Sequence, residues 1–329
     1  MIKKSIFVVC ALLFTLCGSA NSAIIYMGPT ETYTNLQSAM SAMSAGDTLI
    51  IRDGTYTGDS NTIDYLHVPP TALGTWTTIQ AENPGSVVFD GEYERNMFYV
   101  DGNNAGNLHY IHFDGIIWKN SSTQGCVTLL GISGTYNEYV YFSRCGFSDA
   151  GINQSTSYNG IYLRWINHGL IEDCYSWGEL YYGLIYEQCT NSIMRRCVSR
   201  FDIHRGPLGG ACAVYSSSDI ELQNCIAIDC DRDAAYTDLT EGLKGFFYPT
   251  TDGPSTNIYT RGCIALNLNA DGKIYSGMTS ANGGGSNFVF ENFVAYDTSG
   301  GFWDRISGNT YINSVFAESA GSVISEGIA

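Results

Sequence analysis

Hydrophobic and polar positions alternate in short runs along most of the chain, and eight of these runs share one shape. Each has an apolar residue, two mostly polar residues, then a cysteine or a substitute, and then a short strand-like run. The runs are HFDGIIW, FSRCGFS, IEDCYSW, MRRCVSR, LQNCIAI, TRGCIAL, FENFVAY and INSVFAE. Polar or glycine-rich loops separate them. Such units predict a solenoid of short parallel strands.

The marker positions of the repeat recur at intervals of 22 to 38 residues. They are Gly115, Cys145, Cys174, Cys197, Cys225, Cys263, Phe293 and Val315. Two earlier segments, 47–58 and 86–92, have the pattern of less regular coils of the same solenoid. One helix is predicted, over residues 34–45. Glycine is abundant (37 residues) and proline is rare (7), which suits strands joined by tight turns.

The cysteine column has a packing explanation, because coils of a solenoid stack about 4.8 Å apart and the same inward position recurs in each coil. Buried cysteine packs as a small hydrophobic residue. Nine cysteines follow residue 23, and an odd number in an exported protein leaves at least one thiol unpaired. We expect packed free thiols, with one or two disulfides as the alternative. No CxxC pair supports a zinc site.

The first 23 residues contain two lysines, an apolar run and then small residues, which is the layout of a secretory signal peptide. The apolar run is short for a membrane span, which takes about 20 residues. We therefore expect residues 24–329 to form one exported domain, extracellular or periplasmic, with no membrane span. The sequence stops inside what reads as another coil. This predicts a fragment, or a second copy or further domain that covers the open end.

The chain has 16 Lys and Arg against 32 Asp and Glu, a formal net charge of −16. This balance argues against nucleic acid as a partner, since binding it takes a basic face. An acidic polysaccharide is also repelled unless a local basic patch or a bound cation reverses the field. The local charged clusters therefore decide which partners fit.

Two segments, TYTNLQSAMSAMSAGDTLIIRDGTYTG (32–58) and IQAENPGSVVFDGE (79–92), resemble the opening coils of the pectin-lyase-like superfamily. The repeats carry the resemblance towards the C-terminus. It implies an all-β fold, a right-handed single-stranded parallel β-helix with a short N-terminal capping helix. It does not select a reaction, because this fold hosts lyases, hydrolases, epimerases, adhesins and phage tail proteins.

The segment MRRCVSRFDIHRG (194–206) gathers Arg196, Arg200, His204 and Arg205 in an otherwise acidic chain. Arginine offers a planar fork that binds carboxylates or sulfates. The cluster therefore indicates a clamp for an acidic sugar, with Arg196 and Arg200 in contact with the substrate. The alternative is a set of surface ion pairs, for example with Asp173 in the coil below.

The segment IDCDRDAAYTD (228–238) places Asp229, Asp231 and Asp233 at alternate positions. If a strand continues through them, the three carboxylates share one face. A Ca²⁺ ion would relieve their repulsion, since calcium takes six to eight oxygen ligands. The alternative is a solvated acidic loop.

The segment around Lys244 is similar to the lysine-bearing coil of calcium-dependent pectate lyases with this fold. The matched positions are Gly242, Lys244, Asn267, Asn269, Asp271 and Gly272. In that family the lysine is the base and neighbouring aspartates hold calcium, so the resemblance implies these roles here. The alternative is an ordinary structural lysine on a strand.

Together the three groups favour a lyase that cleaves an acidic polysaccharide by β-elimination. The reaction needs a neutralised uronate carboxylate and a base for the C5 proton, and Lys244, His204 and Arg205 are the predicted catalytic residues. A non-catalytic adhesin or carbohydrate-binding surface is the first alternative, because Tyr182 and its aromatic neighbours can stack on sugars. A glycoside hydrolase, which needs two carboxylates about 5–9 Å apart, is the second.

Overall fold

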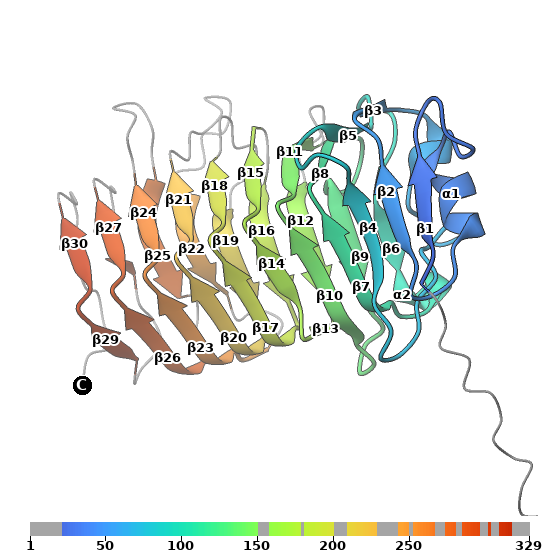
Figure 1. Cartoon of the computed structure of the whole chain (residues 1–329). Helices are drawn as coiled ribbons and strands as arrows, with labels where there is room; N and C mark the ends of the chain where they lie inside the picture. The colour runs from blue at the N-terminus through green and yellow to red at the C-terminus, as the bar shows by residue number, and fades with distance from the viewer. Residues whose placement is uncertain are drawn as a thin grey trace, which may run out of the picture.

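A computed structural model of the chain describes residues 22–150, 158–178, 181–200, 209–228, 243–249, 253–266, 274–280, 285–296, 302–303 and 309–317. Successive turns of the chain stack into three long sheets around one core (Figure 1). The chain is a right-handed parallel β-helix, as the repeats predict. The predicted signal peptide lies almost wholly outside the described residues.

Sheet 1 is the face nearest the viewer in Figure 1. It consists of β1 (Ile24–Met27), β2 (Thr48–Ile51), β4 (Thr77–Ala81), β7 (His109–Asp114), β10 (Asn137–Ser143), β13 (Ile166–Asn167), β14 (Leu170–Glu172), β17 (Thr190–Arg195), β20 (Ser218–Gln223), β23 (Thr256–Arg261), β26 (Ser286–Glu291) and β29 (Thr310–Ile312).

Sheet 2 follows it in each coil. It consists of β3 (Gly54–Tyr56), β5 (Val87–Asp90), β8 (Ile116–Ser121), β11 (Gly146–Ala150), β15 (Tyr175–Trp177), β18 (Val198–Arg200), β21 (Ile226–Ile228), β24 (Ile264–Leu266), β27 (Val294–Tyr296) and β30 (Val315–Ala317).

Sheet 3 closes the coil. It consists of β6 (Tyr99–Asp101), β9 (Val127–Leu130), β12 (Asn159–Arg164), β16 (Tyr182–Glu187), β19 (Gly210–Tyr215), β22 (Leu243–Tyr248), β25 (Ile274–Ser280) and β28 (Phe302–Trp303). Neighbouring strands in all three sheets pair in parallel, for example β10 with β7, β11 with β8, and β16 with β19.

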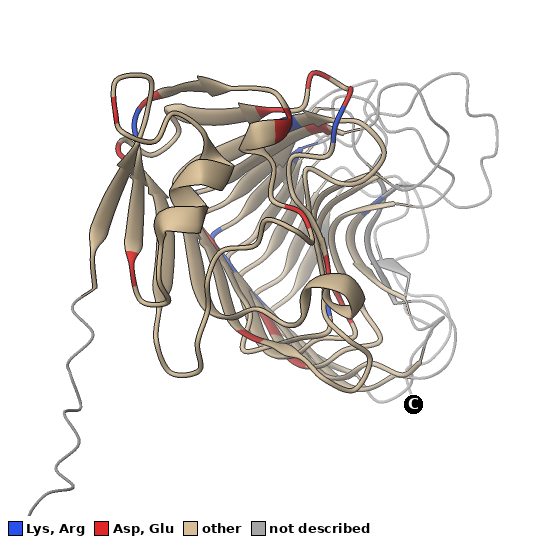
Figure 2. Cartoon of the chain, turned by 90° about the vertical axis from the view of Figure 1, so that its right-hand side faces the viewer, with Lys and Arg blue, Asp and Glu red and all other residues tan. Residues whose placement is uncertain are grey.

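Helix α1 (Leu36–Ala42) covers the N-terminal end of the stack, as Figure 2 shows from that end. The Asn35 side chain accepts a hydrogen bond from the Ser38 amide at 3.0 Å and caps the helix N-terminus. Leu36, Ala39 and Met40 are buried against the first coil. The predicted capping helix is confirmed, although it is shorter than the predicted range 34–45. A 3₁₀ turn, η1 (Asp59–Asn61), and a short helix, α2 (Gly102–Ala105), lie in the connections.

The repeat has a geometric cause at the corner between sheets 1 and 2. The residue at this corner has a positive φ in coil after coil. These residues are Gly115, Arg144, Asp173, Arg196, Asn224, Gly262, Asn292 and Asn313, with φ between 49° and 72°. One residue in this conformation turns the chain, so the next residue points inward. The motif of apolar, polar, polar and cysteine therefore reads inward, outward, corner, inward.

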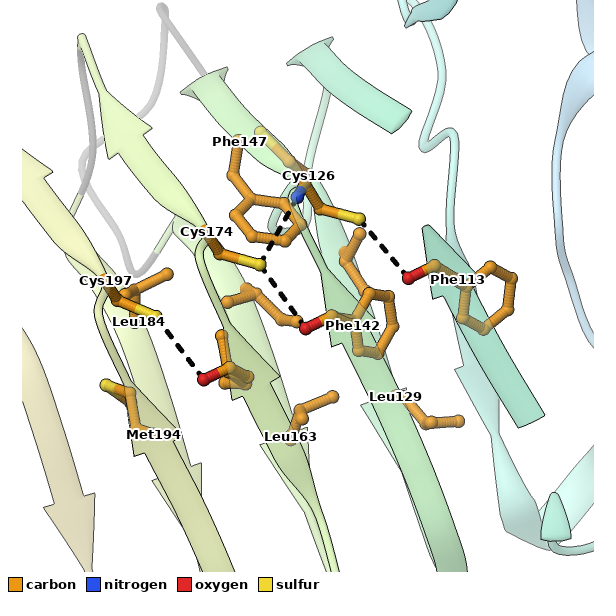
Figure 3. Packing of buried hydrophobic residues seen from close by; sticks show 14 of the residues in the cluster. Phe113, Cys126, Leu129, Phe142, Phe147, Leu163, Cys174, Leu184, Met194 and Cys197 are labelled. Carbon is orange, nitrogen blue, oxygen red and sulfur yellow. Dashed lines mark hydrogen bonds between the residues drawn. The ribbon is translucent and has the colours of Figure 1, made fainter. Parts of the chain in front are cut away.

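The inward residue after the corner forms the predicted cysteine column. Cys145, Cys174, Cys197, Cys225 and Cys263 are all buried and free. Each thiol donates to the carbonyl oxygen two residues before it and to one in the preceding coil, for example Cys174 Sγ to Glu172 O (3.3 Å) and Phe142 O (3.5 Å) (Figure 3).

The strand register corrects two markers of the column. Ile116 and Ser314 occupy the column at its two ends, one residue away from the predicted Gly115 and Val315. Gly115 is a corner residue, and the exposed Val315 lies just after the column. Cys126, Cys189 and Cys212 are also buried and free, at other positions of the coil. The expectation of packed free thiols is confirmed for the eight cysteines that the structure describes.

Aromatic side chains fill the N-terminal half of the core. Phe113 and Phe142 stack at 4.9 Å, and Trp118 and Phe147 stack at 6.0 Å between ring centroids. The rings of Phe113, Phe142 and Phe147 lie beside the thiols in Figure 3. Burial raises the pKa of Cys189 to about 12, so this thiol stays protonated and unreactive at neutral pH.

We predict that Cys225→Ala lowers the free energy of unfolding by about 1–3 kcal/mol, because it removes a buried group from a tightly packed column. Urea denaturation followed by circular dichroism measures the change. Val315→Ala is the matched control, since Val315 is 52% exposed at the edge of the same column and its truncation leaves the midpoint nearly unchanged. An unchanged midpoint for Cys225→Ala would contradict the packing role of the thiols.

Candidate functional site

Most of the predicted site residues belong to the connections from sheet 2 to sheet 3. Residues 201–209 join β18 to β19, and residues 229–242 join β21 to β22. His204 and Arg205 fall in the first connection, and Asp229, Asp231 and Asp233 fall in the second. These five residues lie outside the described part of the chain. The other four predicted residues are described: Lys244 on β22, Tyr182 on β16, Arg200 at the end of β18, and Arg196 just before β18.

A second apolar cluster lies on the outer face of sheet 3. Tyr182, Ile185, Ala213 and Phe247 form it, with Tyr162, Tyr181 and Tyr215 packed against it. We call Tyr182, Tyr215, Lys244 and Phe247 the tyrosine–lysine cluster. It joins two residues that the sequence singles out, Tyr182 and Lys244, with two that it does not.

A glycine lets these side chains face outward. In a regular strand Tyr182 and Leu184 would share one face, yet Leu184 belongs to the main core and Tyr182 to the outer cluster. Gly183 lies between them, and a Cβ there would clash with Ser199 Oγ and lie 2.6 Å from Ala211 O. The strand thus turns its glycine towards sheet 2 and its tyrosine outward. The sequence Lys244–Gly245–Phe246 repeats this order in β22, and Phe246 is again in the core.

Register places Tyr182, Gly210 and Lys244 opposite one another in three successive coils. A Cβ at Gly210 would lie 2.9 Å from Phe247 Cβ, so the middle position has no room for a side chain. Lys244 Nζ lies 4.4 Å from the centre of the Phe247 ring, a cation–π geometry. The Lys244 side chain is almost fully withdrawn from water, since the residue is only 2% exposed.

The tyrosine pair completes the cluster. The Tyr182 ring lies nearly parallel to Phe247, at 6.3 Å and 12°, while Tyr215 meets Phe247 edge to face at 5.8 Å. The Tyr182 and Tyr215 hydroxyl groups share a hydrogen bond. Burial, and then the neighbouring Tyr215, raise the pKa of Tyr182 well above the ordinary value of 10. Its phenol therefore stays protonated at neutral pH and can donate a hydrogen bond to a bound oxygen.

The arginines of the basic segment lie elsewhere on the coil. Arg196 is a corner residue between sheets 1 and 2, and its Nε donates to Asp173 Oδ1 at 2.7 Å. It also pairs with Glu172, which Arg195 Nε contacts at 2.9 Å. The ion-pair interpretation, including the partner Asp173, is confirmed for Arg196. Arg200 ends β18 on sheet 2 with its side chain exposed. The structure therefore aligns Tyr182 with Lys244 on sheet 3 and places Arg196 at the corner between sheets 1 and 2.

Among the residues that the structure describes, no three His, Cys, Asp or Glu side chains gather as metal ligands do. No helix in the same part of the chain is long and apolar enough to cross a membrane.

Two cluster residues escape sequence reasoning, Tyr215 and Phe247. Their strands, β19 and β22, begin 28 or more residues after Tyr182 in the sequence. Only the pairing register of the strands brings the three rings together. A sequence pattern could have aligned these strands. The order of outward residue, small residue and core residue recurs in YGL (182–184), GAC (210–212) and KGF (244–246).

Comparison with solved structures finds the same architecture. Pectate lyase Pel9A matches with a TM-score of 0.60 at 14% sequence identity, over 92% of this chain and 79% of that chain. An alginate lyase from a Paenibacillus species matches with a TM-score of 0.53 at 10% identity, over 90% and 99% of the two chains. No family model and no curated protein matches the sequence. The chain has the pectin-lyase-like parallel β-helix fold, which confirms the predicted resemblance.

We predict that Arg196→Gln destabilises the protein most above about pH 5, and that the deficit shrinks as the pH falls below about 4. Hydrogen bonds from Arg196 hold the pKa of Asp173 below its ordinary 3.8, and Arg195 followed by Arg196 hold that of Glu172 below 4.5. A carboxylate with a lowered pKa stabilises the folded state above its unfolded pKa, and this contribution is lost as the pH falls through the folded value. Urea midpoints between pH 3 and pH 7 test this, and an equal deficit at both ends of the range would contradict it.

Proposed function

We propose that this chain is an exported lyase that cleaves an acidic polysaccharide by β-elimination, with Lys244 as the base. One observation carries the proposal: Lys244 and Tyr182 occupy the same register position two coils apart on the outer face of sheet 3, and both lie against Phe247. The two strands β19 and β22 begin directly after the connections that contain the other predicted residues. The chemistry-bearing residues thus belong to neighbouring coils.

The tyrosine–lysine cluster offers the groups that the reaction needs. A neutral Lys244 amine removes the C5 proton of a uronate, the C5–H electrons form the C4–C5 double bond, and the C4–O bond breaks. The leaving oxygen takes a proton, and the protonated phenol of Tyr182 is the donor in this proposal. Burial favours the neutral form of a lysine, and Lys244 is buried. A substrate reaches Nζ only when a rearrangement exposes it.

Neutralising the uronate carboxylate is a separate requirement. We assign it to Arg200, Arg205 and His204, with Arg196 excluded because two carboxylates hold it. Asp229, Asp231 and Asp233 are the residues that would hold Ca²⁺, and a bound Ca²⁺ ion would add positive charge at the carboxylate. Within the described residues the carboxylates do not form such a site.

Two further observations bear on the choice of reaction. Two solved structures with the same fold and TM-scores above 0.5 are named as lyases. The strands of sheet 3 carry two carboxylates, Asp101 at the end of β6 and Glu187 at the end of β16. They align three coils apart, about 14 Å at the coil spacing, and Glu187 pairs with Arg164 at 3.1 Å. A hydrolase needs two carboxylates across its substrate, so these described strands favour the lyase.

A non-catalytic carbohydrate-binding protein is the second candidate. The observation that favours it is the burial of Lys244 against Phe247, which also suits a lysine with a purely structural role. In this case acidic polysaccharide binds and no bond breaks.

We predict that Lys244→Ala lowers turnover by a factor of about 10² or more, because general base catalysis contributes at least that much. Ultraviolet absorbance of the unsaturated product reports the reaction on polygalacturonate or alginate with added Ca²⁺. Lys119→Ala is the matched control, since this lysine pairs with Asp90 on sheet 2 at 3.2 Å, and it keeps full turnover. Tyr182→Phe removes only the hydroxyl group. We expect this variant to keep the ring packing and to lose turnover.

Circular dichroism checks that each variant keeps its strands. Unchanged turnover in Lys244→Ala would remove this residue from the mechanism. Binding of the polysaccharide by the unsubstituted protein without any product absorbance would establish the second candidate instead.

A further inference from the structure

We propose that the outer face of sheet 1 carries a separate polysaccharide-binding site, built from Trp76, Tyr110, Tyr139 and Tyr141. We call these four residues the Trp76 platform. They lie on β4, β7 and β10 or directly before them, whereas the tyrosine–lysine cluster lies on β16, β19 and β22 of sheet 3. The class of ligand, a polysaccharide, rests on the proposed function. The site itself rests on its own geometry.

The platform is built on a stack of rings at the start of successive strands. Tyr110 and Tyr139 stack at 4.5 Å and 22°, and Tyr139 and His168 stack at 4.5 Å and 5°. All three residues have a positive φ, between 52° and 58°, at equivalent positions in consecutive coils. Such a conformation costs energy for bulky residues, and the stacking of their rings offsets part of this cost.

Trp76 lies beside this stack and not at its end. Its ring centre is 5.5 Å from Tyr110 and 6.4 Å from Tyr139, at interplanar angles of 77° and 81°. The two tyrosine rings are only 4.5 Å apart, so an indole at the end of the stack would be much farther from Tyr139 than from Tyr110. The indole instead runs along the axis of the solenoid, across the edges of both rings. Tyr141 also contacts it, with ring centres 4.4 Å apart at an interplanar angle of 46°.

The surrounding structure fixes Trp76 and leaves it open to water. A tight turn precedes it, closed by the Ala72–Thr75 bridge with Gly74 at φ +74°. Thr77 Oγ1 then donates to Pro70 O at 2.8 Å. The indole is nevertheless 37% exposed. In Figure 1 no described helix or strand covers sheet 1 at β4, β7 and β10.

The chemistry of the platform fits a sugar chain. A fixed, partly exposed indole offers a flat apolar surface for the C–H face of a pyranose ring, and the neighbouring phenols offer hydrogen bonds to its hydroxyl groups. Burial raises the pKa of Tyr110 and Tyr141, so these phenols carry no charge at neutral pH. Two arginines near the platform are held by carboxylates: Arg144 Nε donates to Asp114 Oδ1 at 2.8 Å, and Arg195 Nε donates to Glu172 Oε1 at 2.9 Å. Contact with the platform rings themselves is therefore uncharged.

Affinity electrophoresis in gels that contain polygalacturonate or alginate tests the platform with the full chain. Trp76→Ala weakens retention roughly tenfold, the size of a lost aromatic contact, and Trp76→Phe restores part of it. Tyr175→Ala is the matched control, because Tyr175 is also 37% exposed and also stacks on a ring, Trp177 at 4.9 Å, but on sheet 2. It binds like the unsubstituted protein. Raising the salt from about 0.05 to about 0.5 M screens the repulsion between the acidic chain and the polysaccharide, so it does not weaken retention.

Four results would overturn the platform: full retention of Trp76→Ala, an equal loss in Tyr175→Ala, a steep loss with salt, or a change in oligomeric state of Trp76→Ala on size-exclusion chromatography. The last result would make this face a contact between copies of the chain.

The test of the platform can be told apart from the test of the proposed lyase function. If Trp76→Ala loses retention while no protein shows turnover, the platform stands and the lyase fails. If Lys244→Ala loses turnover while Trp76→Ala binds normally, the lyase stands and the platform fails.

Discussion

Register between parallel coils is the constraint on which the rest of the molecule depends. Each residue has as its neighbours the residues at the same position in the coils above and below, about 4.8 Å away. Any favourable contact between like side chains is therefore available in every coil. The thiol column, the row of corner residues with positive φ and the stack of Tyr110, Tyr139 and His168 all follow from this one condition. The alignment of Tyr182 with Lys244, two coils apart, follows from the same register.

The corners of the coil differ in how much variation they allow. From β7 onward a single residue makes the turn between sheets 1 and 2, and the next side chain enters the core, so an insertion there would displace the whole column. Between sheets 2 and 3 the connections range from the four residues that separate β15 and β16 to the fourteen that separate β21 and β22. Added length in a surface loop costs little. Reactive residues can therefore accumulate at this corner while the core stays unchanged.

The sequence predicts the coil more reliably than the site, for a physical reason. Cysteine at an inward position is a local signal, and it identifies five members of the column directly. Where Ile116 and Ser314 replace it, the predicted markers fall one residue away, because only backbone pairing fixes the register there. Trp76 and Tyr141 are 65 residues apart in sequence and 4.4 Å apart between ring centres. Because the coils differ in length, a fixed spacing in the sequence does not predict such contacts between rings. Lys244 was found through a resemblance, while its partners Tyr215 and Phe247 needed the structure.

The arginines show how an acidic solenoid uses its few positive charges. Each of several arginines reaches across the coil spacing to carboxylates of neighbouring coils: Arg52 to Glu31, Arg144 to Asp114, Arg196 to Asp173, and Arg261 to Glu221 and Glu291. Figure 2 shows basic and acidic residues interspersed on the outside of the stack. Exposed pairs of this kind add little stability, but they satisfy carboxylates that would otherwise repel one another at the coil spacing.

These guanidinium groups are therefore held by the protein's own carboxylates. Beside these paired charges the described faces also expose aromatic rings, such as Trp76 and Tyr175. In the proposed function, recognition of a negative charge is assigned to Arg200 at the end of β18 and to His204 and Arg205 in the connection that follows it.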